Sequence, residues 1–297
     1  MTSADLAALA SIAAVVWLAG CVLLALLNFI PRFSATVRSI WPLMLSEAAI
    51  LAGGTVTFLL PEPLIIICLI AAAARIGLET AWVFGMAQGG NGALRGSIFL
   101  AGLTATVLFV PQTGFAALAI TIVAAALAAV AVAVGTTGGL RPLLQFFLFP
   151  SLPLACFVLA ARHPELRAWL VAAFLLVELF DSMSLLAGRL FGRTPLIPRI
   201  SPRKTVEGLG GGILFTAAGA AALSAAFGLS VWMALILLIV VVLAAVTGDL
   251  TASAAKRRAD VKDYPPILII QGGLTDIVDA WLVTGPVLIA VLVLIGA

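Results

Sequence analysis

Acidic residues near the C-terminus suggest a metal site. Asp276 and Asp279 lie three residues apart in the segment QGGLTDIVDA (271–280), just before a long apolar stretch. Residues spaced by three share one face of a helix, although acids at a helix start can also simply complement the helix dipole. A further acid, Asp249, ends another apolar stretch. Carboxylates from two helices can approach across a bundle, and Mg²⁺ prefers such hard oxygen ligands.

Cationic and hydroxyl side chains supply the complementary half of such a site. The segment ISPRKTVEG (200–208) places donors at the start of an apolar helix, and GLGGG (208–212) allows close backbone approach. A second segment, KRRADVKD (256–263), is rich in Lys and Arg. A divalent metal with basic side chains and backbone donors is what phosphoryl or nucleotidyl transfer requires. The candidate donors are Ser201, Arg203, Lys204 and Thr205, then Lys256, Arg257 and Lys262.

Other chemistries find little support in the sequence. The Walker pattern is absent, which excludes a P-loop, and the only histidine, His163, is expected on the opposite membrane face. The three cysteines lie in apolar runs without disulfide or zinc spacing. The net charge of +3 suits anionic headgroups or nucleotide phosphates, and no nucleic-acid-binding signature appears, so we expect no nucleic-acid partner.

Composition places these residues in a membrane protein. The 297 residues are 63% hydrophobic and 10% charged, whereas a soluble domain carries about 25% charge. Apolar stretches of about 17–25 residues mark spanning helices. We therefore expect an all-α, polytopic bundle of about ten transmembrane helices in one membrane domain, 1–297. The predicted spans are 4–29, 42–60, 63–83, 96–110, 114–134, 142–160, 168–190, 208–228, 231–250 and 277–296.

The basic residues predict the orientation of these spans. If the N-terminus lies outside, all of the 16 basic residues except Arg162 and Arg167 face the cytoplasm. We therefore expect both termini on the non-cytoplasmic side and the polar segments 189–207 and 250–276 in the cytoplasm. Each polar feature also has a purely structural interpretation. Asp249 could lie at the membrane interface, the basic segment 256–263 could anchor the chain on the cytoplasmic side, and Asp181 could form a hydrogen bond between helices. Their convergence on one face favours a functional site.

Two long segments resemble the phosphatidate cytidylyltransferases, also called CDP-diacylglycerol synthases. The segment FDSMSLLAGRLFGRTPLIPRISPRKTVEGLGGG (180–212) carries their Asp-Ser, Gly-x-x-Phe-Gly and Ser-Pro-x-Lys-Thr-x-Glu-Gly elements. The segment GDLTASAAKRRADVKDYPPILIIQGGLTDIVDA (248–280) follows their signature of Ser, Lys-Arg, Lys-Asp, Gly-Gly and two spaced acids. Within the membrane domain, the resemblance divides the chain into an extra helix at 1–30, N-terminal helices at 31–165 and a catalytic core at 166–297.

The resemblance implies a membrane enzyme, often dimeric, that transfers CMP from CTP to a lipid phosphate and releases pyrophosphate. It implies Mg²⁺, with room for a second cation such as K⁺, and suggests Asp249 and Asp276 as ligands. Asp181 and Asp279 would complete the metal shell, and the basic residues, with Gly272 and Gly273, would hold phosphates. We expect a homodimer, in the inner membrane of a bacterium, with its active site facing the cytoplasm.

Four positions depart from the family pattern, while the proposed metal ligands are retained. Gln271 stands where the family has His, Ile277 where it has Arg, Pro265 where it has Gly, and Leu185 where it has Tyr. We therefore predict a divergent member that keeps the CTP and metal machinery and uses phosphatidate or a related lipid phosphate. The alternatives are a CTP-dependent polyprenol or phytol kinase and a transporter in which Glu178 and Asp181 line the path.

Overall fold

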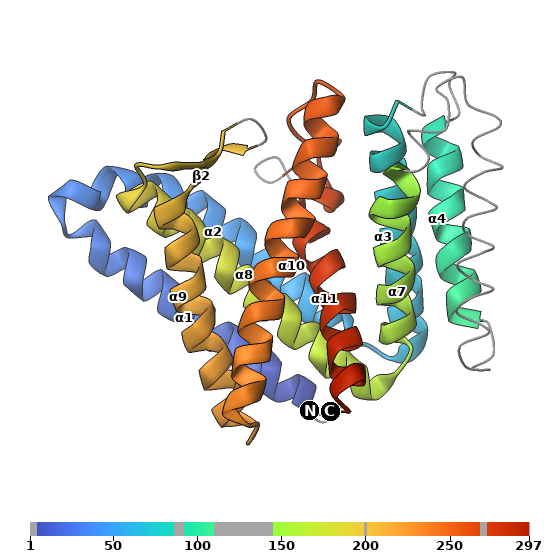
Figure 1. Cartoon of the computed structure of the whole chain (residues 1–297), viewed down its shortest axis with the longest axis horizontal. Coiled ribbons are helices and arrows are strands. Elements are labelled where there is room, and N and C mark those ends of the chain that lie inside the picture. Colours follow the sequence, from blue (N-terminus) through green and yellow to red (C-terminus); the bar gives the residue numbers. More distant parts are fainter. Residues whose placement is uncertain (1–4, 86–91, 110–144, 199–200, 268–271, 297) are drawn as a thin grey trace.

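The structure is a computed structural model that describes residues 5–85, 92–109, 145–198, 201–267 and 272–296. Within these ranges, seven helices are long and apolar enough to cross a membrane, which confirms an all-α, polytopic membrane bundle (Figure 1). The predicted span 114–134 lies outside the described residues. The seven helices are α1 (Leu6–Asn28), α2 (Pro31–Thr57), α3 (Glu62–Val83), α8 (Pro164–Phe191), α9 (Val206–Ala226), α10 (Val231–Arg258) and α11 (Leu274–Ile295).

Shorter elements complete the described chain. Helix α4 (Gly92–Phe109) packs against α3, and a short helical turn, η2 (Phe147–Ser151), leads into α7 (Leu152–Ala161). Two strands, β1 (Pro195–Ile197) and β2 (Ser201–Thr205), form an antiparallel hairpin between α8 and α9. Both ends of the described chain lie at the end of the bundle opposite this hairpin (Figure 1). The total of ten spans, the membrane side of the termini and the division of the chain at 30 and 165 stay predictions.

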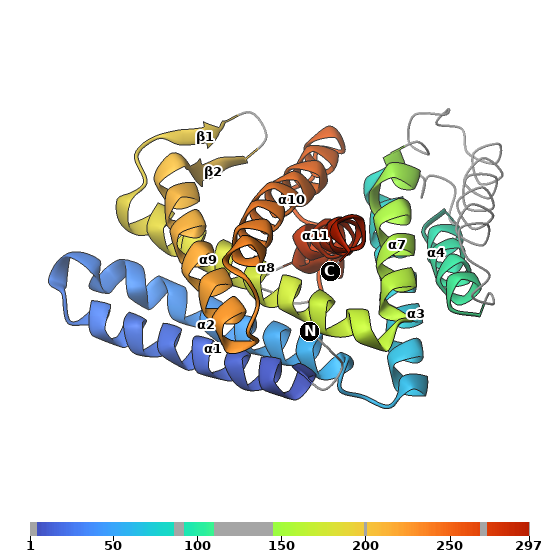
Figure 2. The ribbon, with the colours of Figure 1, turned by 60° about the horizontal axis from the view of Figure 1, so that its bottom comes forward.

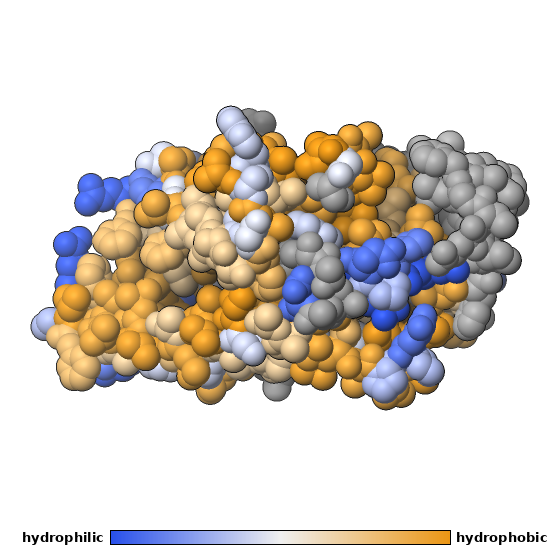
Figure 3. Space-filling model, turned by 90° about the horizontal axis from the view of Figure 1, so that it is seen from below, coloured by the Kyte–Doolittle hydropathy of each residue, from blue (hydrophilic) through white to orange (hydrophobic). Residues whose placement is uncertain are grey.

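Helices α1 and α2 lie side by side along one edge of the molecule (Figure 2). The expected polar connection at 30–41 is largely helical, because α2 begins at Pro31, where the missing N–H of proline costs no hydrogen bond. Many large apolar side chains on α1 remain exposed, Val15, Leu18 and Val22 among them. Apolar residues also cover most of the face that carries the chain termini (Figure 3). Such surfaces suit contact with lipid chains rather than water.

Helix α8 contributes many of the fully buried side chains and contacts α1, α2, α7, α9, α10 and α11. Trp281 of α11 packs its ring against Phe174 of α8 and Phe157 of α7, with ring centroids 4.6 and 4.7 Å apart. Its indole N–H also donates a hydrogen bond of 3.0 Å to the Leu170 carbonyl. This aromatic cluster holds α11 against α8, the pair of helices that carry three of the predicted metal-binding acids.

The crossing of α10 and α11 depends on a glycine. A Cβ atom added to Gly248 would lie 2.5 Å from the Asp279 carbonyl oxygen, so only a residue without a side chain allows this approach. Helix α10 continues to Arg258, beyond the predicted span end at 250. Asp249 and Lys256 therefore lie on one continuous helix. Both face the region where α11 begins.

The hairpin is an addition that the helical pattern did not predict. The donors of 201–205 lie on strand β2 instead of in a loop. Thr205 then caps α9, since its hydroxyl accepts the Gly208 N–H at 3.1 Å. Glu207 in the first turn of α9 accepts the backbone N–H groups of Arg193 and Thr194, at 3.0 and 3.2 Å. These bonds tie both sides of the hairpin to the start of α9.

Candidate active site

A cavity of about 660 Å³ opens between α8, α10, α11 and β2. We call it the carboxylate cavity, because acids from four helices (α2, α8, α10 and α11) line it together with hydroxyl and cationic groups. Apart from Glu47, which the sequence did not single out, the polar residues of the cavity come from the segments 180–212 and 248–280, and the fold brings them to one site. The polar lining residues are Glu47, Asp181, Asp249, Asp276 and Asp279, the cations Arg189, Arg203 and Lys204, and the hydroxyls of Ser182, Ser184, Ser201 and Thr205.

Asp276 is the most strongly held of these acids. The ammonium group of Lys256 donates a hydrogen bond to its Oδ1. Its Oδ2 accepts the backbone N–H groups of Tyr264 at 2.8 Å and Gly273 at 3.0 Å. The side chains of both members of the ion pair are largely buried, at 8% exposed for Asp276 and 10% for Lys256. Three charge-assisted hydrogen bonds therefore orient this carboxylate at the start of α11.

Asp249 is paired with a different lysine and is more accessible. Lys204 of β2 donates a hydrogen bond to its Oδ2, which joins the hairpin to α10. The Asp249 side chain is 22% exposed and that of Lys204 34%. Each of the two proposed metal ligands thus carries a lysine from a segment that the sequence assigned to phosphate binding.

The two remaining acids of the predicted metal site line the same cavity from different helices. Asp181 of α8 is half-buried in the cavity wall. Asp279 is buried, and its Oδ1 accepts the N–H of Ala280 at 2.6 Å. Asp276 and Asp279 lie on one helical turn and both line the cavity, as their spacing predicts.

This set of donors fits Mg²⁺ bound together with a phosphate ligand. Among the described residues, no three acidic, His or Cys side chains lie close enough together to hold a metal ion by themselves. Mg²⁺, however, is commonly held by one or two carboxylates and completes its shell with water and substrate phosphates. Asp249 and Asp276 would hold the ion. Lys204 and Lys256, now paired with these acids, would be free to turn toward the phosphates.

Sequence reasoning missed Glu79, which organises the start of α11. Its side chain is fully buried and accepts the backbone N–H groups of Leu274 at 2.9 Å and Thr275 at 2.7 Å. Arg75, one turn earlier on α3, forms an ion pair with it at 2.6 Å and donates to the Pro265 carbonyl. A carboxylate at a helix N-terminus satisfies donors that the helix leaves free. An acid inside a predicted span was the available signal.

Tyr264 is a second residue that the sequence did not single out. Its ring is buried beneath the ammonium group of Lys256, 5.4 Å from the ring centroid. Burial raises the pKa of its hydroxyl, and the nearby charges of Asp279, Asp276 and Glu79 raise it further. Tyr264 therefore stays neutral and supports Lys256 through its ring.

Comparison with known proteins assigns the chain to a family. The model of the cytidylyltransferase family matches residues 8–295. The chain belongs to the cytidylyltransferase family. Curated relatives named phosphatidate cytidylyltransferase include one from Staphylococcus saprophyticus, 36% identical over 122 residues, which cover 40% of this chain and 47% of the relative. One from Aquifex aeolicus is 35% identical over 119 residues, which cover 38% of this chain and 45% of the relative. The chain thus spans about half the length of the relatives it matches.

Some predicted residues of this cytidylyltransferase family member lie outside the cavity wall. Arg257 is exposed, and its guanidinium donates to the Val261 carbonyl at 3.0 Å. Lys262 is exposed, and its Nζ lies 3.3 Å from Oδ2 of the neighbouring Asp263. Gly273 contributes its backbone N–H to Asp276, and Gly272 adopts a φ of +86° directly before it. The roles of Arg257, Lys262 and Gly272 in binding phosphate stay predictions.

Two of the four departures from the phosphatidate cytidylyltransferase pattern line the carboxylate cavity. They are Leu185 on α8 and Ile277 on α11, next to Asp276. Pro265 lies in the loop before α11 and keeps a role there through its carbonyl. Gln271 lies outside the described residues. The departures at the cavity replace polar groups of the family by apolar ones, so they make the cavity wall less polar.

Proposed function

We propose that this protein transfers CMP from CTP to a lipid phosphate, phosphatidate or a related one, and releases pyrophosphate. The observation that carries this proposal is a pair of acids, Asp249 and Asp276, each held by a lysine at one cavity of a membrane bundle. Membership of the cytidylyltransferase family across residues 8–295 supports the use of CTP. The names of the relatives support a lipid phosphate as acceptor.

The reaction needs positioning and charge neutralisation more than acid–base chemistry. An oxygen of the lipid phosphate attacks the α-phosphorus of CTP, and the bond from that phosphorus to the pyrophosphate oxygen breaks. The attacking oxygen is already anionic, so no strong general base is required. Bound Mg²⁺ would neutralise the triphosphate and favour an in-line arrangement.

The residues of the cavity divide these tasks between them. Asp249 and Asp276 would hold the cation, with Asp181 and Asp279 beside them in the cavity wall. Lys204 and Arg203, with the hydroxyls of Ser201 and Thr205, provide donors for phosphate oxygens along β2. Lys256, which contacts Asp276, is placed to stabilise negative charge that develops on the phosphates in the transition state. The basic residues Arg257 and Lys262 would draw anionic substrates to this face.

The location of the site follows from the same proposal. The hairpin lies at the end of the bundle opposite the chain termini (Figure 1). An excess of basic residues at 189–207 and 250–276 favours the cytoplasmic side for that end. We therefore place the protein in a bacterial inner membrane, with the carboxylate cavity open to cytoplasmic CTP. The homodimer rests on the family resemblance alone.

The test is a CTP assay on purified protein with a panel of lipid phosphates, read by mass spectrometry. CTP labelled at the α-phosphate should transfer its label to lipid, and pyrophosphate should appear in equal amount. Label that stays in water-soluble CDP, with a phosphorylated lipid alcohol as product, would identify a kinase instead. Absence of any lipid product with an otherwise folded protein would favour a transporter. Asp249→Asn serves as the inactive control.

A further inference from the structure

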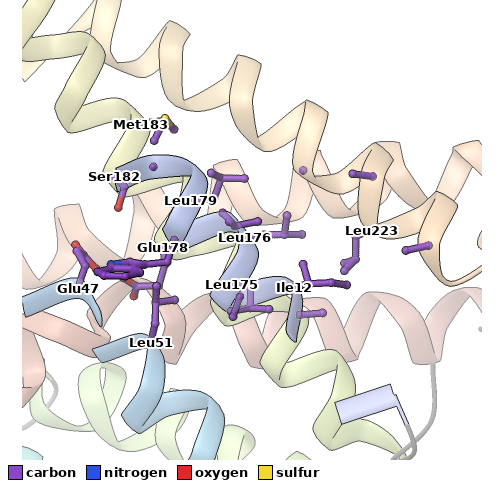
Figure 4. Close-up of a pocket in the computed structure, with 18 of the residues that line it drawn as sticks. Ile12, Glu47, Leu51, Leu175, Leu176, Glu178, Leu179, Ser182, Met183 and Leu223 are labelled. Carbon is purple, nitrogen blue, oxygen red and sulfur yellow. The ribbon is translucent and has the colours of Figure 1, made fainter. Parts of the chain in front are cut away.

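A second cavity, of about 310 Å³, lies between α1, α2, α8 and α9. We call it the α1 pocket. Apolar side chains form most of its wall, and Figure 4 shows Ile12, Leu175, Leu176 and Leu223 toward one end. Glu47 and Ser182 lie at the other end (Figure 4). The pocket is therefore apolar over its length and polar at one end.

The polar end of the α1 pocket meets the carboxylate cavity. Glu47 and Ser182 line both of them. The carboxyl groups of Glu47 and Glu178 lie next to each other at this end of the pocket. Oε2 of Glu47 is buried, and within the described chain it receives no hydrogen bond from a protein N–H or O–H group. A buried carboxyl oxygen without a donor in a membrane span is costly and points to a ligand group.

The chemistry of the proposed acceptor matches this arrangement. A lipid phosphate must place its phosphate among Lys204 and the cavity acids while its hydrocarbon chain stays in an apolar environment. The α1 pocket offers that environment in direct continuity with the cavity. The surrounding lipid is as apolar as the pocket, so moving a hydrocarbon chain from lipid into the pocket contributes little binding free energy. Its effect lies in fixing the position of one chain, and hence of the phosphate, relative to Asp249.

We infer that the α1 pocket binds one hydrocarbon chain of the lipid phosphate acceptor, with Glu47 at the junction between chain and headgroup. The inference rests on the proposed function, since it names where the acceptor of that reaction lies. It also gives α1 a role: Trp17 of α1 donates a hydrogen bond of 3.1 Å to the Met44 carbonyl of α2, which closes the pocket wall. The helix expected as an extra element thus becomes part of the acceptor site.

Two neighbouring alanines of α9 allow a matched test. Ala222 lines the α1 pocket, whereas Ala221 does not, and both are exposed on the same helix. Ala222→Phe should fill the pocket and lower kcat/KM for long-chain lipid phosphates by about tenfold, the scale on which hydrophobic pockets discriminate substrates. Rates with short-chain lipid phosphates should change much less. Ala221→Phe should behave as the wild type at every chain length. Equal chain-length profiles for the two variants would overturn the inference.

A binding measurement keeps the inference separate from the reaction. A phosphatidate carrying a photoreactive diazirine in one chain should label peptides of α1, α8 or α9 that line the pocket, and Ala222→Phe should reduce this labelling. Unlabelled phosphatidate should compete, whereas phosphatidylcholine with the same chains should not. Labelling elsewhere, or equal competition by both lipids, would show that only bulk membrane lipid enters and would refute the inference. If the wild type formed no CDP-lipid, the proposed function would fail. The labelling would still show whether the α1 pocket binds a chain of the lipid phosphate.

Discussion

Lys256 in the last turn of α10 donates a hydrogen bond to Asp276 in the first turn of α11. A cation at a helix C-terminus and an anion at a helix N-terminus each complement the dipole of their own helix, so the contact stabilises both ends at once. It also closes the loop that carries Tyr264. The two parts of the 248–280 signature are therefore one structural unit, with the acid of one part held by the base of the other.

Asp249 and Asp276 should respond differently to loss of charge. We expect Asp249→Asn and Asp276→Asn each to lower turnover by more than about 100-fold, as removal of a preorganised electrostatic group does. Asp276→Asn should also cost about 3 kcal/mol of stability, because it leaves the largely buried Lys256 unpaired. Asp249→Asn should change stability little, since its pair with Lys204 is more exposed. Thermal unfolding in detergent measures the stability of both variants, and a CTP assay measures their turnover. Wild-type turnover in either variant would show that the substituted aspartate is not a metal ligand.

Lys204 and Lys262 provide a comparison of two lysines assigned to phosphate. Lys204 lines the cavity, whereas Lys262 is exposed outside it. We expect Lys204→Met to raise the KM for CTP by about tenfold or more, because the variant loses one charge-assisted hydrogen bond to the substrate. We expect Lys262→Met to have a small effect on KM that depends on salt concentration. Initial rates against CTP concentration at two ionic strengths measure this. An equal loss in both variants would mean that Lys262 reaches the substrate by a rearranged loop.

Gly273 should not tolerate a side chain. A Cβ atom at this position would lie 2.7 Å from Oε2 of Glu79 and 2.8 Å from Cβ of Tyr264. We expect Gly273→Ala to cost about 1–3 kcal/mol, as overpacking of a filled interior does. Gly210→Ala on α9 is the control, because its Cβ would meet nothing within 4 Å and alanine favours the helix. Unfolding of both variants in the same detergent compares them, and equal stability would contradict the packing argument.

Glu79 should act on the site from a distance. Glu79→Gln removes a charge that holds Leu274 and Thr275, and we expect a stability loss of about 2 kcal/mol together with a lower kcat, because Asp276 loses its fixed position. Glu62→Gln is the matched control on the same helix, since the Glu62 side chain is 65% exposed. Thermal unfolding and the split between kcat and KM are the readouts. A normal kcat in a destabilised Glu79→Gln protein would show that Glu79 contributes to stability and does not position Asp276 for the reaction.

Ile277 tests the departure from the family at the cavity. It lines the cavity beside Asp276, so an arginine there would reach the bound phosphates. We expect Ile277→Arg to raise kcat/KM for ordinary phosphatidate by about tenfold relative to Ile277→Leu, which keeps the apolar surface. A panel of lipid phosphates measures the shift. Unchanged preference would show that Ile277 does not decide the acceptor.

The sequence by itself determined the class of the protein and predicted most of the acids and cations that line the cavity. Hydropathy is a local property, so nearly every predicted span with described residues appears as a helix, and the spacing of Asp276 and Asp279 predicted their common face. The order of the motifs in two segments also predicted the family that the comparison shows.

Only the tertiary structure decided which side chains meet. Lys204 reaches Asp249 and Lys256 reaches Asp276, whereas Arg257 and Lys262 in the same basic segment point elsewhere. Glu79 is nearly 200 residues from the backbone groups it holds, and α1 forms a pocket wall with α8 and α9. These pairings depend on how each helix is rotated and where helices cross, as at Gly248. Long-range packing sets those quantities, and local sequence patterns carry little information about them.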